Sequence, residues 1–170
     1  MSIYLKRLRE AVLLSLFYLT VAATVSSCLP HKEQTINPER PAYPVRCQGK
    51  TFYVELADTY ERMCLGLMYR KRLRANHGMI FFFQPPRRAS FWMKNTAIPL
   101  SVAFLDSEAV IMEIRHLEPF DKTLVFSTSS QVSYAIEMER GWFDENNITV
   151  GSKVDLSSLP QIPLLSPQQQ

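Results

Sequence analysis

The stretch Met79–Phe83, which reads MIFFF, decides the fold because five apolar side chains follow one another without alternation. A run of this kind is typical of a strand that is buried on both faces, or of a strand in a barrel. Asn76-His77-Gly78 precedes the run, and Pro85 and Pro86 break the chain after it. We therefore expect this strand to lie inside the protein rather than on its surface.

Shorter stretches on both sides of this run also have the patterns of strands. Apolar and polar residues alternate over 52–56, and a turn at 48–50 predicts a hairpin with 43–47. A second hairpin is predicted for 101–106 and 109–115, around a turn at 106–108. Further strands are expected at 123–126, 132–138 and 153–156, with a short helical turn around 143–146.

One helix is expected after the first hairpin. Asp58 is placed to cap it, with Glu61 three residues on as the reciprocal partner of a capping box. Gly66 costs about 1 kcal/mol relative to alanine in a helix, so the helix is expected to be short or closely packed there. One helical face then gathers five residues: Tyr60, Met63, Cys64, Leu67 and Met68.

These patterns predict an α+β, mainly β fold in a single compact domain. The chain has 170 residues, of which 46% are hydrophobic and 21% charged, as in ordinary globular proteins. Many short strands with one early helix indicate an antiparallel curled sheet or a partly open barrel, with the short helix near its start. We place this domain at residues 43–159, after a Pro-rich tether at 28–42 and before a flexible tail at 160–170.

The first residues, 1–27, have the pattern of an export signal. Basic side chains precede an uncharged apolar run at 11–25. The following VSSC at 25–28 resembles the lipobox of bacterial lipoproteins, in which Cys28 is diacylated and becomes the mature N-terminus. Buried acyl chains contribute about 0.8 kcal/mol per CH₂, enough to hold a domain at a membrane. An uncleaved signal anchor stays open as the alternative, since no charge occurs between Ala11 and Pro30.

Either anchor places the domain outside the cytoplasm, facing the periplasm or the cell surface. Leu29 lacks the aspartate that resembles an inner-membrane retention signal, which favours the outer membrane. Removal of the signal takes away three basic and one acidic side chain, so the formal net charge falls from +3 to +1. Nucleic acid is therefore not an expected partner.

Two cysteines remain in an oxidising compartment once Cys28 carries lipid. An even pair, Cys47 and Cys64, is compatible with a disulfide that would stabilise the fold by roughly 3 kcal/mol. Two separately buried thiols are equally compatible with the sequence.

Candidate chemical groups are few. The three histidines belong to no cluster with metal-ligand spacing, so no metal is expected. The sequence has no nucleophile elbow, so nothing points to a catalytic serine. It also has no phosphate-binding loop, and no cofactor is expected. Asp106 and Glu137 are the candidate catalytic carboxylates, because both lie at or in predicted strands. For Glu137 a plain solvent-facing position is the alternative, because it alternates with apolar neighbours.

The stretch SFWMKNT at 90–96 is the candidate ligand site. Strand alternation places Trp92 and Lys94 on one side, and Asn95 with Thr96 favours a turn. An indole, an ammonium group and an amide together suit an anionic or sugar-like ligand. The structural alternative is that Trp92 covers a core edge while the Lys94 side chain extends past it.

Four motifs closely resemble the bacterial and archaeal domain-of-unknown-function family numbered 192. They occur in the family's order: Gly66-Leu67-Met68 with Arg70, Gly78 to Phe83, Phe91 to Thr96 with Pro99-Leu100, and Tyr134 to Glu137. The resemblance implies a small, β-rich, commonly exported domain whose biochemical role is not established. Ser101 departs from the pattern, since an Asp commonly follows the Pro-Leu pair in the family.

Three hypotheses of function follow. The leading one is a non-catalytic, membrane-tethered envelope module that binds a small ligand, a glycan or a segment of an envelope protein, with candidate ligand-binding residues Arg70, Trp92, Lys94, Asn95, Thr96 and Glu137. The second is an envelope hydrolase that uses Glu137 or Asp106 as acid or base, with Lys94 as charge stabiliser. The third is a structural accessory without a ligand site.

Overall fold

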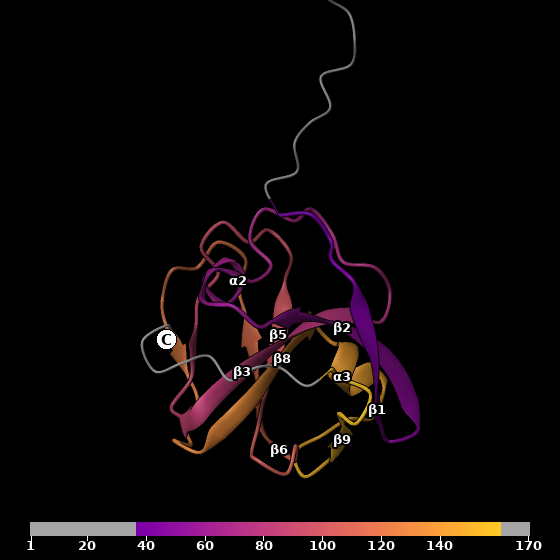
Figure 1. Cartoon of the computed structure of the whole chain (residues 1–170). Coiled ribbons are helices and arrows are strands. Elements are labelled where there is room, and N and C mark those ends of the chain that lie inside the picture. The colour runs from indigo at the N-terminus through magenta and orange to yellow at the C-terminus, as the bar shows by residue number, and fades with distance from the viewer. Residues whose placement is uncertain (1–36, 161–170) are drawn as a thin grey trace, which may run out of the picture. The chain divides into compact units, whose positions relative to one another are not determined.

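A curled sheet of seven strands forms the body of the domain in the computed structural model, which describes residues 37–160 (Figure 1). Its strand order is β6-β5-β8-β3-β2-β1-β9, and β4 and β7 form a separate two-stranded sheet. The strands are β1 (Ala42–Cys47), β2 (Lys50–Ala57), β3 (His77–Arg87), β4 (Ser90–Phe91), β5 (Leu100–Leu105), β6 (Ile111–Leu117), β7 (Val125–Phe126), β8 (Val132–Glu139) and β9 (Val154–Asp155). The predicted fold class, a mainly β single domain with a curled sheet, is confirmed.

The strand that contains MIFFF is buried on both faces, as its sequence predicts. β3 lies between β2 and β8 in the sheet. Ile80 packs into one hydrophobic cluster, which we call the far-side core, together with Phe52, Ile136 and Trp142. Met79, Phe81 and Phe83 pack into a second cluster on the opposite face, the pocket-side core. Both faces of β3 therefore need apolar side chains, which explains the missing alternation.

The sheet departs from the antiparallel prediction at one pair. β2 and β3 run parallel, with Val54 opposite Gly78 and Leu56 opposite Ile80. A parallel pair needs a long connection between its strands. Here the helix α2 (Tyr60–Leu65) and the loop after it form that connection, so that β3 begins beside β2 and runs in the same direction. The two predicted hairpins, β1 with β2 and β5 with β6, are present and antiparallel.

The cap of α2 differs from the prediction. Thr59, not Asp58, is the N-cap, because the Thr59 hydroxyl accepts a hydrogen bond from the Arg62 N–H at 3.2 Å. Asp58 instead pairs with the Arg62 guanidinium. The helix has six residues, none of them buried, and it ends at Gly66, whose φ of 48° is left-handed. A second short helix, α3 (Trp142–Glu145), stands where the helical turn was expected.

Of the two alternatives that the sequence leaves open for Cys47 and Cys64, the structure has the free thiols rather than the disulfide. Cys47 is buried in the far-side core, where burial raises its pKa, whereas Cys64 is exposed on α2. The two side chains therefore belong to different parts of the domain.

The ordered domain begins before residue 43. The Asn37 side chain is 1% exposed and donates hydrogen bonds to the carbonyl oxygens of Gly66 and Met68, at 2.9 and 2.8 Å. The predicted export signal, Cys28, the tether before residue 37 and the tail after residue 160 lie outside the described residues. Within 37–160 no helix has the length and apolar character needed to cross a membrane.

Candidate binding pocket

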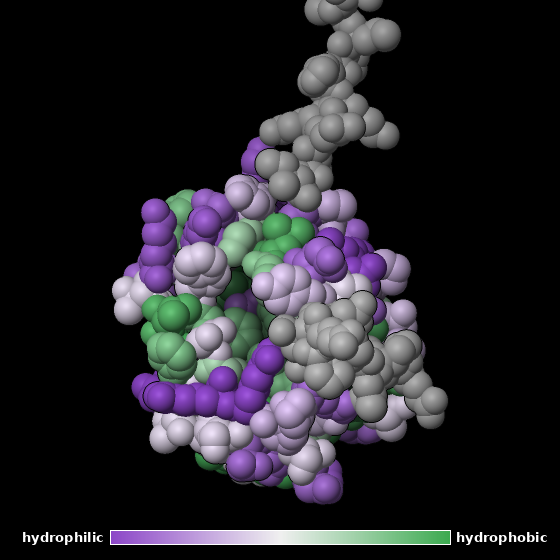
Figure 2. Space-filling view, turned by 60° about the vertical axis from the view of Figure 1, so that its left-hand side comes forward, coloured by the Kyte–Doolittle hydropathy of each residue, from purple (hydrophilic) through white to green (hydrophobic). Residues whose placement is uncertain are grey.

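A pocket of about 290 Å³ opens beside the pocket-side core. Its walls come from α2 and the loop after it, from β3 and from the chain around β4, and Figure 2 shows a hollow on this side of the molecule with apolar side chains around it. Most of the lining is apolar. The lining residues that carry the argument below are Tyr60, Phe81, Arg87, Arg88, Trp92 and Glu137.

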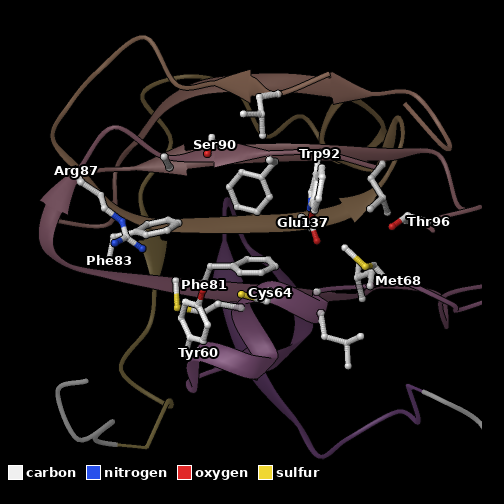
Figure 3. A pocket seen from close by; sticks show the side chains of 18 of the residues that line it. Tyr60, Cys64, Met68, Phe81, Phe83, Arg87, Ser90, Trp92, Thr96 and Glu137 are labelled. Carbon is white, nitrogen blue, oxygen red and sulfur yellow. The ribbon is translucent and has the colours of Figure 1, made fainter. Parts of the chain in front are cut away.

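Glu137 supplies the carboxylate of the pocket. It lies in the middle of β8, opposite Met79 of β3 and Val102 of β5, and only 4% of its surface is exposed. Figure 3 shows its side chain beside Trp92, directed at the cavity. A Cβ placed on Gly66 would lie 4.0 Å from Oε2 of Glu137, so the turn after α2 sits close to the carboxylate. The solvent-facing alternative for Glu137 is therefore wrong.

Burial shapes the chemistry of this carboxyl group. Desolvation raises the pKa of Glu137 from 4.5 to about 8, and the positive charge of Arg70 opposes part of that rise. No group in the described part of the chain donates a hydrogen bond that would stabilise the carboxylate. At neutral pH the carboxyl is therefore mostly protonated, and it can donate one hydrogen bond and accept others.

Aromatic side chains form much of the pocket wall. The Phe91 ring meets the Phe81 ring edge to face, with 5.0 Å between centroids, and it meets the Phe83 ring at 6.5 Å. Phe91 also packs on Phe104 of β5 at 5.7 Å, which ties the wall to the sheet. Trp92 is 41% exposed and lies at the mouth. The wall is thus packed against the sheet at its base and exposed at its rim.

Arg70 does not line the pocket, but its positive charge acts on Glu137 in the pocket. Its guanidinium forms a two-pronged ion pair with Glu55, with N–O distances of 2.5 and 2.7 Å, and both side chains are buried. Glu55 is opposite Met79 on β2, and Met79 is opposite Glu137, so the two carboxylates lie on one sheet face on either side of Met79. Arg70 thereby neutralises Glu55 and acts on Glu137 only through space.

The polar triplet 94–96 is a turn that holds the pocket together. Asn95 has a left-handed φ of 56°, and the Thr96 N–H bonds to the Met93 carbonyl at 3.1 Å. The Asn95 side chain donates to the Tyr69 hydroxyl at 2.6 Å, and the Tyr69 N–H donates to the Asn95 carbonyl at 2.8 Å. The turn therefore fixes the loop after α2, and Thr96 itself, 3% exposed, lines the pocket.

Lys94 does not share the pocket with Glu137. Its ammonium lies 5.1 Å from the centroid of the Trp92 ring, and the residue is exposed rather than part of the lining. The two side chains do meet, but β4 ends at Phe91, so strand alternation is not the cause of this contact.

Asp106, a candidate catalytic carboxylate, and Ser101, which departs from the family pattern, lie away from the pocket. Asp106 is in the β5–β6 turn, where its carboxylate accepts hydrogen bonds from the N–H groups of Glu108 and Val110, both at 2.9 Å. Ser101 is buried and its hydroxyl contacts Nδ1 of His116 at 2.9 Å. In the described part of the chain, His, Cys, Asp and Glu side chains form no group of three that could hold a metal ion.

Sequence reasoning missed Arg87, Arg88 and the sulfur and aromatic side chains of α2 as site residues. A signal for the latter exists, because the five residues predicted to share one helical face all line the pocket: Tyr60, Met63, Cys64, Leu67 and Met68. For Arg87 and Arg88 the sequence offers no signal beyond two neighbouring charges after a proline pair.

Comparison with known proteins places this architecture in a family. No curated protein matches the chain. A crystal structure of a protein of unknown function from Novosphingobium aromaticivorans DSM 12444 is 34% identical, with a TM-score of 0.63, over 67% of this chain and 84% of that one. A candidate transcription regulator from Sinorhizobium meliloti 1021 is 29% identical, with a TM-score of 0.66, over 72% and 99% of the two chains. The model of DUF192, described as an uncharacterised ACR family, matches residues 43–156, and the chain therefore belongs to the DUF192 family.

Proposed function

We propose that this domain is a non-catalytic binding module whose ligand site is the pocket above Glu137. One observation carries the proposal: a buried carboxyl group points into an apolar pocket and has no hydrogen-bond partner among the described residues. The Glu137 carboxyl faces the pocket, so it is available to hydrogen-bond a ligand. A ligand that hydrogen-bonds to Glu137 would therefore be favoured over a wholly apolar one.

The size and lining of the pocket support a small ligand among the three classes that the sequence leaves open. A volume of about 290 Å³ holds roughly ten water-sized volumes, which is at the lower end for ligand sites. Aromatic and thioether side chains dominate the wall, so the ligand is expected to be mainly apolar with a polar group that reaches Glu137. A glycan or a protein segment would not fit as a whole, so it would have to reach Glu137 by inserting one apolar group into the pocket.

The hydrolase hypothesis has one supporting observation, the raised pKa of Glu137, which is the property of a general acid. Against it, Asp106 is held in a surface turn and Lys94 lies over Trp92, so neither is placed to act together with Glu137. If the domain has a purely structural role, no compound should bind in the pocket. A substitution that fills the pocket should then have no effect on the response to any compound.

We further propose that the module is an envelope lipoprotein anchored through Cys28, at the outer membrane. The support is the basic, apolar and VSSC sequence of its first 28 residues. Mass spectrometry of the mature N-terminus tests this directly. We expect a chain that begins at an acylated Cys28, and an intact Met1 would contradict the lipid anchor.

A thermal-shift experiment on the full-length chain tests the binding proposal. Short alcohols, amides, sugars and peptides are screened against the wild type and against Ser90→Trp, which places an indole at an exposed lining position. Ser107→Trp, at an exposed turn outside this pocket, is the matched control. We expect compounds that stabilise the wild type and Ser107→Trp but not Ser90→Trp. Equal stabilisation of all three chains would reject the pocket as the site.

A further inference from the structure

The pocket has fixed positive charge in its lining. Arg87 and Arg88 both contribute to the wall, and their guanidinium carbons lie 5.0 Å from the Phe83 ring centroid and 4.9 Å from the Phe126 ring centroid. Arg88 is steadied by a hydrogen bond from Nε to the Ser127 carbonyl at 3.0 Å. In the part of the chain that the structure describes, no carboxylate pairs with either arginine.

Glu137 is the acidic residue of the lining, and it is separated from Arg87 along the cavity. Figure 3 shows Arg87 beside Phe83 at one end, Met68 and Thr96 at the other, and Glu137 beside Trp92 between the centre and the second end. The space between Arg87 and Glu137 is bordered by apolar side chains, among them Phe81 and Tyr60. The pocket is therefore elongated, with the Arg87 cation at one end and an uncharged hydrogen-bonding group, the Glu137 carboxyl, toward the other.

The positive charge at one end of the pocket favours a ligand with a negatively charged head group. An anionic head group at Arg87 would gain charge-assisted hydrogen bonds, which are roughly twice as strong as neutral ones, and Arg88 adds a second positive charge to the wall. A cationic head group would meet like charge at this end. The protonated state of Glu137 at neutral pH agrees with an anionic ligand, because an ionised carboxylate in the same pocket would repel it.

We infer that the ligand is a small anionic amphiphile, with a carboxylate-type or phosphate-type head at the Arg87 end, an apolar body of roughly ten non-hydrogen atoms along the aromatic wall, and a polar group that reaches the Glu137 carboxyl. This inference rests on the proposed function, since it names the ligand class of the same pocket. The exposed apolar side chains at the mouth, Tyr60, Trp92 and Leu124, suit the entry of such a molecule.

Calorimetric titration of the full-length chain with three eight-carbon probes tests the inference. Octanoate, octanol and octylammonium have the same body and differ in head-group charge. At pH 6.5 we expect octanoate to bind about tenfold more tightly than octanol, and octylammonium to bind most weakly. We expect the affinity for octanoate to fall as salt is added.

Two variants locate the effect. Arg87→Gln should reduce octanoate affinity about tenfold, to the level of octanol, whereas Arg46→Gln, an exposed arginine of β1 outside the lining, should leave it unchanged. Equal affinity for octanoate and octanol, unchanged by Arg87→Gln, would overturn the anionic class while the pocket remained a binding site. Tightest binding of octylammonium would also overturn it. If no probe binds, or if Ser90→Trp binds all three as well as the wild type does, the proposed function fails with it.

Discussion

Glu137 is the residue on which the account depends most. Its carboxyl group lies in the centre of β8 with neighbouring strands on both sides, where burial disfavours the ionised form. A group in this position lowers the stability of the folded chain at neutral pH. A buried carboxyl group whose pKa is strongly raised is typical of sites that act on a ligand.

The pH dependence of unfolding should reveal this cost. Below about pH 4.5 the Glu137 carboxyl is protonated in both the folded and the unfolded chain, so its ionisation does not contribute to the pH dependence of stability. Between 4.5 and about 8 the unfolded chain ionises while the folded chain stays protonated, so the wild type loses stability as pH rises. We therefore expect Glu137→Gln to match the wild type near pH 4 and to exceed it by a few kcal/mol at pH 8. Denaturant unfolding across this range measures the difference, and a difference that stays constant with pH would contradict the buried, protonated state.

Gly78 shows a steric requirement at the same place in the sheet. A Cβ on this residue would lie 2.1 Å from the carbonyl oxygen of Glu137 and 2.4 Å from the sulfur of Met138. The first contact is with backbone, which cannot rotate away. We expect Gly78→Ala to lower the free energy of unfolding by about 3 kcal/mol or more.

Gly49→Asn is the control for Gly78→Ala. Gly49 is in the β1–β2 turn with open space around its Cα and a φ of 76°, a conformation that asparagine tolerates. Its substitution should cost less than about 1 kcal/mol, and a similarly small loss for Gly78→Ala would mean that β3 and β8 are less closely packed than described.

At the scale of elements, the loop after α2 is fixed to the sheet by the Arg70–Glu55 pair. Both side chains are buried, so removal of one leaves an uncompensated charge. Arg70→Met should therefore lower stability by about 3–5 kcal/mol, whereas the double variant Arg70→Met with Glu55→Leu should recover most of that loss. Chemical unfolding of the four chains of this double-mutant cycle provides the measurement. An additive double variant would show that the pair does not interact.

The elements also show what the sequence can and cannot predict. The strands and both hairpins follow from local periodicity and turn residues, and MIFFF alone indicates a two-sided core. Periodicity assigns Glu137 and Ala135 to one face of β8 and Ile136 and Met138 to the other, but it does not say whether the first face is covered. That cover comes from α2 and the β4 region, which are distant in sequence, so the burial of Glu137 was not predictable from its own strand.

The face of α2 gives the complementary case. Its apolar side chains have the spacing of a packed helix, yet no residue of the helix is buried, and the face borders a cavity instead. An amphipathic pattern is the same whether the helix packs on a core or lines a pocket. The cap was mispredicted for a local reason, since Thr59 and Asp58 are both good caps and only the chain geometry selects between them.

At the scale of the whole domain, the sheet separates two environments. The far-side core is closed by α3 and contains Ile111, Ile148 and Trp142, whereas the opposite face carries the pocket. A ligand that binds as proposed should perturb the second environment and leave the first one unchanged. This separation provides internal controls within a single molecule.

Methyl NMR of the full-length chain, titrated with octanoate and separately with octanol, tests the central claim most directly. The pocket reporters are the methyl groups of Met63, Met68 and Leu124, and the far-side reporters are those of Ile111 and Ile148. We predict saturable shifts at the three pocket residues and none at the two far-side residues, with the pocket shifts lost in Ser90→Trp. Shifts centred on Ile111 and Ile148, or none that saturate with either compound, would contradict the account.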